Sequence, residues 1–382
     1  YHLVSGPLDH TNATRLRTML PFTAPSVLDC RESFGTGDRI GGIAPATPGH
    51  IDAVGAKGIV PVLAQQSVRE NHKTGRTFGS VMDDATWAVF REGFRKPWGS
   101  DADHLKTLDD IADAVHAGFT MFTLDPSEKI DHAADTDAGE ALAAKFSALF
   151  PSGNDADAFI SRYEGKVGAA TGDVARAAVK YLPAIRHAAA AYHHLADLRG
   201  GAGFNFEMSI DETSTPTTAL DHRIIAGELG REHVTLFSLA PRFEGAFEKG
   251  VDFRGSLDGF RRSLETHIRL SRELGGYRLS LHSGSDKFSV YPMFGELTDG
   301  FYHVKTAGTS YLEAVRVAAA SDYGLFTRIL ALSLDTFKEN AASYQISADP
   351  ANVPDPSALP PEDADRYLTS NDDFRTVLHI PF

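Results

Sequence analysis

Cysteine is the scarcest residue type in this 382-residue chain, with a single copy at Cys30. No disulfide can form within the sequence, which favours a reducing compartment. No stretch approaches the ~20 consecutive apolar residues that a membrane helix needs. The first ten residues, YHLVSGPLDH, also lack the basic-then-apolar pattern of a signal peptide. We therefore expect a cytoplasmic protein that does not interact with a membrane.

Positive charge is also in short supply. The chain has 37 Lys and Arg against 51 Asp and Glu, a net charge of -14. A nucleic-acid-binding protein would show a basic stripe, and none is present. An anionic small molecule is still compatible with this charge, because a few Arg and Lys side chains can hold a carboxylate inside an acidic protein. The sequence leaves open whether the chain forms a homo-oligomer.

Short apolar runs recur along the chain, separated by helical patterns. They lie at residues 26–29, 59–64, 94–104, 119–124, 204–209, 234–239, 278–282 and 301–304, and the third is placed mainly by its position in the series. Runs rich in Val, Ile, Leu, Phe or Thr are typical of buried parallel strands. Alternating strands and helices predict an α/β fold, and eight units favour closure into a (β/α)8 TIM-type barrel. An open doubly wound sheet is the alternative.

Two segments depart from this alternation. Residues 133–200 show no strand pattern, so we predict a helical insertion after the fourth strand, which could cover the mouth of the barrel. Residues 349–382 begin with a stretch rich in Pro, Asp and Ala, for which we predict an extended C-terminal surface segment. The whole chain, 1–382, is otherwise predicted to be one catalytic domain.

Ionisable residues collect where the predicted strands end, which is the functional face of such a barrel. Glu207 lies within the apolar run FNFEMS, and a carboxylate in a buried strand is costly unless it is paired or binds metal. His282, His303 and His104 also follow or end predicted strands. Ligands of these types suit a divalent ion such as Zn, Mn, Co or Ni. We therefore predict that His104, Glu207, His282 and His303 bind a metal, although no compact motif such as HExxH is present.

Further polar residues at the same strand ends are candidates for catalysis and substrate binding. Asp125 and Lys106 are candidates for proton transfer, although Asp125 could simply cap the turn before Pro126. Asp211 and Glu212 could support the site or form a turn. The predicted substrate-binding residues supply charges or amides that can hold a carboxylate or hydroxyl groups; they are Arg39, Gln65, Gln66, Asp103, Arg242, Asp286, Lys287 and Lys305.

Eight short segments, taken together, resemble the tagaturonate/fructuronate epimerase family. They extend from about residue 37 to residue 314 and read GDRIGGIAPATPGH, AQQSVRE, PWGSDADHLKT, GFTMFTLDPSEK, FEMSIDET, SLAPRFEG, LHSGSDKFSVYP and FYHVKTAGTSYLEA. The resemblance implies a metal-dependent epimerase that interconverts D-tagaturonate and D-fructuronate. Some relatives are similar enough in chemistry to act on the ketohexoses tagatose and fructose.

The two keto acids differ at a carbon beta to the ketone, whose C–H bond the ketone does not acidify. Retro-aldol cleavage with re-addition, or transient oxidation, would invert this carbon. No GxGxxG motif follows a predicted strand, so a nicotinamide site is not supported. The retro-aldol route is therefore favoured, because it needs only an enolate that a bound metal can stabilise. In a variant of this route, Lys106, Lys287 or Lys305 forms a Schiff base with the ketone. The alternatives are a metal-dependent barrel aldolase or sugar isomerase, and a non-catalytic sugar-acid-binding protein.

Overall fold

The eight strands of the structure close into a parallel barrel, as predicted. The structure is a computed structural model that describes residues 5–42, 46–55, 57–306, 309–342, 344 and 346–381. Each strand pairs in parallel with the next in sequence, and β8 returns to β1. The strands are β1 (Glu32–Gly35), β2 (Val60–Ser67), β3 (Gly99–Leu105), β4 (Met121–Leu124), β5 (Asn205–Ile210), β6 (Ser238–Pro241), β7 (Arg278–Leu281) and β8 (Tyr302–Lys305).

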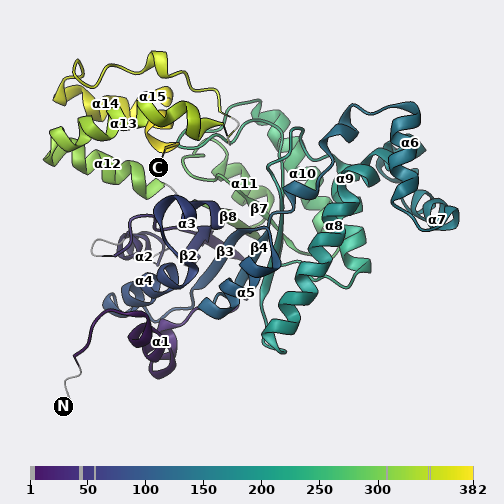
Figure 1. The fold of residues 1–382 in the computed structure, drawn as a ribbon, viewed down its shortest axis with the longest axis horizontal. Coiled ribbons are helices and arrows are strands. Elements are labelled where there is room, and N and C mark those ends of the chain that lie inside the picture. The colour runs from purple at the N-terminus through teal and green to yellow at the C-terminus, as the bar shows by residue number, and fades with distance from the viewer. Residues whose placement is uncertain are drawn as a thin grey trace.

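Helices surround the barrel and extend beyond it at both ends of the molecule (Figure 1). In the first half of the chain they are α1 (His10–Met19), α2 (Thr47–Gly55), α3 (Val68–Thr74), α4 (Phe78–Arg91), α5 (Leu108–Ala117), α6 (Gly139–Ala148), α7 (Gly153–Tyr163) and α8 (Thr171–Arg199). In the second half they are α9 (Ala219–Arg231), α10 (Leu257–Glu273), α11 (Tyr291–Leu297), α12 (Thr309–Ser321), α13 (Tyr323–Ala341), α14 (Pro361–Ser370) and α15 (Asp372–His379). Among the described residues, no helix combines the length and apolar character needed to cross a membrane.

The predicted first strand, at residues 26–29, is wrong. This segment is not a strand, and β1 begins three residues after it, at Glu32. Its backbone is instead held by residues from distant parts of the chain. The Leu28 N–H donates to Asn205 Oδ1 at 2.7 Å, and the Ser26 N–H donates to the Trp98 carbonyl at 2.8 Å. Leu28 is buried, so its apolar character reflects packing outside the sheet. The run at 234–239 likewise enters its strand, β6, only at Ser238.

The segment between β4 and β5 contains both ordinary barrel helix and added structure. The helix α8 packs against α5 and α9, so it takes the place of the outer helix that follows β4 in the barrel. The shorter helices α6 and α7 pack on α8 and lie at the edge of the molecule (Figure 1). The predicted insertion at 133–200 therefore includes one regular barrel helix, because sequence patterning alone does not separate the two kinds.

The prediction of an extended C-terminal segment is also wrong. Residues 361–379 form α14 and α15, which pack with α12 and α13 around a separate apolar cluster containing Phe326, Leu330, Leu368 and Phe374. Pro360 and Pro361 occupy the N-cap and first position of α14, where proline is compatible with a helix. The prediction is therefore wrong for residues 361–379, whereas residues 353–360 lie outside any helix or strand.

Candidate metal centre and surrounding cavity

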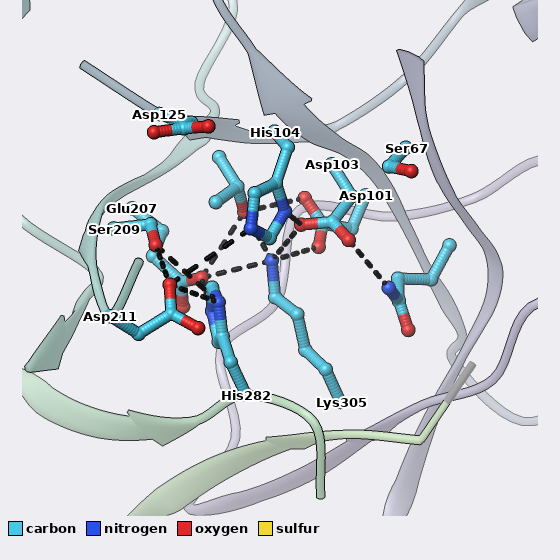
Figure 2. Close-up of polar contacts among 12 residues, drawn as sticks. Ser67, Asp101, Asp103, His104, Asp125, Glu207, Ser209, Asp211, His282 and Lys305 are labelled. Atoms are coloured by element: carbon cyan, nitrogen blue, oxygen red, sulfur yellow. Dashed lines mark hydrogen bonds and ion pairs between the residues drawn. The ribbon is translucent and has the colours of Figure 1, made fainter. Parts of the chain in front are cut away.

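Three side chains from different strand ends meet at the mouth of the barrel. His104, Asp211 and His282 each offer one ligand atom, and these atoms all lie within 4.8 Å of one another. His104 belongs to β3, Asp211 directly follows β5, and His282 directly follows β7. Figure 2 shows the two imidazoles and the Asp211 carboxylate pointing toward one another. Two imidazoles and a carboxylate form a donor set that fits a divalent transition metal.

A distortion in β3 turns His104 into this cluster. The pairing of β3 with β4 shifts between Ala102 and Leu105, and His104 adopts a left-handed backbone with φ of 51°. In a regular strand, neighbouring side chains point to opposite faces. Here His104 Nδ1 lies 2.8 Å from the carboxylate of its neighbour Asp103. Irregularities of this kind re-aim side chains beside functional sites.

Each imidazole is held on one nitrogen by a buried carboxylate and presents the other nitrogen to Asp211. The Nδ1 of His104 pairs with Asp103, and its Nε2 lies 3.9 Å from Asp211 Oδ1. The Nε2 of His282 pairs with Glu207 at 2.7 Å, and its Nδ1 lies 3.2 Å from Asp211 Oδ1. Carboxylates that orient metal-binding histidines in this way are usual around metal sites.

The field at this cluster favours positive charge. Burial alone would lower the pKa of His104, but the Asp103 carboxylate raises it to about 10. Burial likewise opposes the charged form of His282, and the Asp211 carboxylate raises its pKa to about 9. Both shifts favour the protonated imidazoles when no cation is bound. A divalent ion would displace these protons, and its positive charge would then balance the negative charge of the surrounding carboxylates.

Lys305 on β8 connects the two carboxylates that hold the histidines. Its Nζ lies 2.6 Å from Asp103, 2.9 Å from Glu207 and 2.7 Å from Asp101 (Figure 2). Burial disfavours the ammonium, but these carboxylates raise the pKa of Lys305 well above its usual value. Burial also raises the pKa of Asp101 to about 6, against the effect of Lys305. Lys305 is therefore a fixed cation beneath the metal cluster.

Two adjoining hollows form one cavity beside the cluster. They share Asp211, Glu212, Lys249, His282, Ser283 and Tyr344. One hollow continues along β2 and β3 past Gln65, Arg69, Glu70 and Lys305. The other continues toward the loop after β6, past Arg242, Phe243 and Phe247. The whole cavity, which we call the active-site cavity, thus has one part beside the candidate metal cluster and another part lined by cationic and apolar side chains.

Comparison with known proteins agrees with this geometry. A family model described as tagaturonate epimerase matches residues 2–382. The chain belongs to the tagaturonate epimerase family. It is therefore an epimerase, an enzyme of the isomerase class. The family resemblance predicted from the sequence is confirmed.

Relatives with known names and structures cover nearly all of the chain. A tagaturonate/fructuronate epimerase of Thermotoga maritima is 42% identical over an alignment of 383 positions, which covers 98% of this chain and 77% of the relative. The crystal structure of the fructuronate-tagaturonate epimerase of Cohnella laeviribosi with one glycerol is 37% identical, with a TM-score of 0.93 over 100% of this chain and 79% of that one. The native structure of the same enzyme gives a TM-score of 0.92. The predicted (β/α)8 barrel is confirmed by the closed sheet and by these structures.

The structure brings two of the four predicted metal ligands, His104 and His282, into the cluster. Glu207 is fully buried and bonds His282, Lys305 and Ser238, so it stands behind His282. His303 is also fully buried, and its Nδ1 lies 2.9 Å from Ser33 Oγ. Burial lowers the pKa of His303 to about 3, which keeps its imidazole neutral. Ligand roles for Glu207 and His303 stay predictions.

The predicted catalytic pair lies beside the cluster. Asp125 is buried, and its Oδ2 lies 3.8 Å from Lys106 Nζ. Lys106 points outward and also pairs with Glu128 at 3.1 Å. Neither residue is among those that line the active-site cavity. Their roles in proton transfer stay predictions.

The predicted substrate-binding residues are divided between the cavity and the protein interior. Gln65, Asp103, Arg242 and Lys305 line the cavity. The others lie elsewhere: Arg39 pairs with Glu70, Gln66 is fully buried, Asp286 pairs with Arg375 at 3.0 Å, and the Lys287 ammonium bonds backbone carbonyls. Substrate contacts by these four residues stay predictions without support from their placement.

Sequence reasoning named Asp211 only as a residue that could support the site or form a turn, and it did not select Lys249 or Tyr344. Asp211 directly follows β5, so its position at a strand end was the signal that could have placed it in the cluster with His104 and His282. Lys249 lies in the loop after β6, and Tyr344 follows α13; both line the cavity. Neither lies at the end of a strand, so the rule that selected the other candidates could not find them.

Proposed function

We propose that the protein interconverts D-tagaturonate and D-fructuronate with a divalent transition metal held by His104, Asp211 and His282. The observation that carries the proposal is the pairing of each imidazole with a buried carboxylate, which leaves its second nitrogen facing Asp211. The names of the relatives in Thermotoga maritima and Cohnella laeviribosi support the choice of substrates. A reducing cytoplasm is the compartment that we propose for the enzyme.

The chemistry of the substrates favours a retro-aldol route. With the ketone at C2 and the carboxylate at C6, the two sugar acids differ at C4, two carbons from the ketone. The C3–C4 bond breaks when the C4 hydroxyl loses its proton, and the bonding electrons move to C3 and into the ketone. Turning the new C4 aldehyde over and re-forming the C3–C4 bond inverts the centre. A divalent ion, when bound, supplies the Lewis acid that polarises the ketone oxygen.

Glu212 is the best-placed acceptor for the C4 hydroxyl proton. It lines both parts of the cavity, and its Oε1 lies 3.8 Å from His104 Nε2. Burial would raise the pKa of Glu212, but His104 and Arg69 lower it, so the carboxylate is ionised and can accept a proton. Asp125 is the second candidate, because its buried carboxylate lies close enough to His104 to raise the pKa of that imidazole. It ranks below Glu212 because it does not line the cavity.

A Schiff-base route through Lys305 or Lys287 is disfavoured. A Schiff base requires a neutral amine, whereas the Lys305 ammonium is fixed by three carboxylates. Burial lowers the pKa of Lys287 to about 8, but its Nζ is fully buried, donates to the carbonyls of Glu248, Val251 and Ser285, and is not part of the described lining of the cavity. Lys305 instead keeps Asp103 and Glu207 in place behind the two histidines.

The test follows purified enzyme by NMR with tagaturonate, and separately with fructuronate, tagatose and fructose. We expect the two uronates to interconvert; a lasting three-carbon product would instead indicate an aldolase, and an aldose product an isomerase. Tagaturonate deuterated at C4 distinguishes the routes. Retro-aldol chemistry leaves the C4–H bond intact, so we expect no primary kinetic isotope effect. A primary effect would show that C4 is transiently oxidised and would overturn the retro-aldol route.

A further inference from the structure

Among the residues that the structure describes, four Lys and Arg side chains line the active-site cavity, and three of them are already engaged. Arg69 pairs with Glu212 at 2.6 Å, and its guanidinium lies 4.9 Å from the ring centroid of Tyr344. Arg242 donates through Nη1 to the carbonyl of Thr213. Lys305 is surrounded by three carboxylates. The fourth is Lys249, in the loop between β6 and α10.

The Lys249 ammonium differs from the other three. Among the residues that the structure describes, its Nζ has no hydrogen-bond or ion-pair partner, although the side chain is only partly exposed and lines both parts of the cavity. The charge of Lys249 helps to lower the pKa of the nearby Glu70 carboxyl, but the Glu70 carboxylate is already paired with Arg39. A partly desolvated ammonium without a partner is costly, and an anionic ligand would offset that cost.

The backbone around Lys249 is fixed from beneath. The buried Lys287 ammonium donates to the carbonyls on either side, those of Glu248 at 2.8 Å and Val251. From α15, Arg375 Nε donates to the Gly250 carbonyl at 2.7 Å, and Thr376 Oγ1 donates to the carbonyl of Lys249 itself at 3.3 Å. Four consecutive carbonyls are thus held, so the loop presents Lys249 to the cavity without first having to become ordered.

We propose that Lys249 binds the carboxylate of the substrate and makes the enzyme prefer uronates to neutral ketohexoses. The inference rests on the proposed function, because it assigns the anionic end of the same substrate. The metal cluster engages the ketone end, and within the described part of the chain Lys249 is the Lys or Arg of the cavity wall that remains available for the other end. Lys287 is then a positioning residue for Lys249, which accounts for a buried lysine whose three partners are carbonyls near the site.

The test compares Lys249→Met, which removes the charge, with Lys249→Arg, which keeps it. Lys57→Met is the matched control, because Lys57 is exposed near the end of α2. For each metal-loaded variant we measure kcat and KM for tagaturonate, and the inhibition constant of tagatose as a neutral competitor. A hydrogen bond to a charged group is worth enough to predict a rise of about 10- to 100-fold in the KM for tagaturonate of Lys249→Met.

Because the carboxylate does not take part in bond cleavage, we expect kcat to change little and the inhibition constant of tagatose to stay the same. Lys249→Arg should recover most of the affinity, and Lys57→Met should behave as the wild type. An unchanged KM in Lys249→Met, or a parallel rise in the tagatose constant, would overturn the assignment. Wild-type enzyme that fails to interconvert the uronates would instead refute the proposed function, and calorimetric binding of D-glucuronate to the wild type and Lys249→Met would then test Lys249 separately.

Discussion

Replacing Glu207 with glutamine removes one negative charge from behind the metal cluster while almost keeping the volume of the side chain. The Glu207 carboxylate accepts from His282 Nε2 at 2.7 Å and from Lys305 Nζ at 2.9 Å, and both bonds need an acceptor. Both bonds go to the same oxygen, Oε1, so the glutamine oxygen can still accept them, but it lacks the negative charge that strengthens them. The amide group takes the place of Oε2, which accepts from Ser238 Oγ. Lys305 keeps Asp101 and Asp103, so we expect the fold to survive.

The expected effect is on metal affinity. Loss of a partner that orients a metal-binding histidine typically weakens binding 10- to 100-fold, or by about 1.4–3 kcal/mol. Asp211→Asn removes a proposed direct ligand and should weaken binding more than Glu207→Gln. The order of the two variants therefore tests whether Glu207 stands behind His282 or contacts the ion itself.

The assay strips metal with a chelator and titrates each protein with Co²⁺ or Zn²⁺ against a chromophoric competitor. Glu228→Gln is the matched control, since Glu228 on α9 loses comparable contacts with Arg162 and Tyr163 far from the cluster. Circular dichroism checks that each variant is folded. Wild-type affinity in Glu207→Gln would refute the reasoning, and a loss equal to or greater than that of Asp211→Asn would make Glu207 a direct ligand.

Three further predictions concern stability and are measured by urea unfolding of metal-free protein. Lys305→Met leaves three buried carboxylates without their cation and should cost about 3–5 kcal/mol; a loss below about 1 kcal/mol would contradict the role of Lys305. Lys287→Met leaves buried carbonyls without a donor and should cost about 1–3 kcal/mol, whereas an unchanged midpoint would show that the loop does not depend on it. The buried pair His222 and His267, whose Nδ1 atoms lie 2.7 Å apart, predicts a loss of stability in acid. Burial lowers the pKa of His267 to about 4, so only the unfolded chain takes up this proton between pH 6.5 and pH 4. Stability should therefore fall by about 3 kcal/mol over that window, and a pH dependence in His267→Asn as steep as in the wild type would refute this.

The alternation of apolar runs and helical patterns was sufficient to predict the barrel, because buried parallel strands carry a strong hydrophobic signal. The hydrophobic pattern does not reveal a buried strand whose side chains are polar. The strand β3 reads GSDADHL and is almost completely buried, and its carboxylates Asp101 and Asp103 are tolerated there because they pair with Lys305. The opposite error occurred at Leu28, which is buried without belonging to a strand.

Strand-end position selected His104 and His282, which the structure brings into one cluster, but it could not rank the carboxylates. Glu207 lies within β5 and Asp211 directly follows it. Only their spatial partners show that Glu207 bonds one histidine, His282, whereas Asp211 faces both His104 and His282. Lys287 shows a second limit. A lysine after a strand suggests an anion site, whereas its burial and three carbonyl partners depend on loops distant in sequence.

Metal removal and reconstitution test the central claim most directly. Enzyme freed of metal by chelation is incubated with tagaturonate, and fructuronate is followed by NMR before and after addition of Zn²⁺, Mn²⁺, Co²⁺ or Ni²⁺. We predict that the metal-free enzyme is inactive, and that at least one of these ions restores epimerisation in the wild type but not in Asp211→Asn. Full activity of the metal-free enzyme would contradict the account.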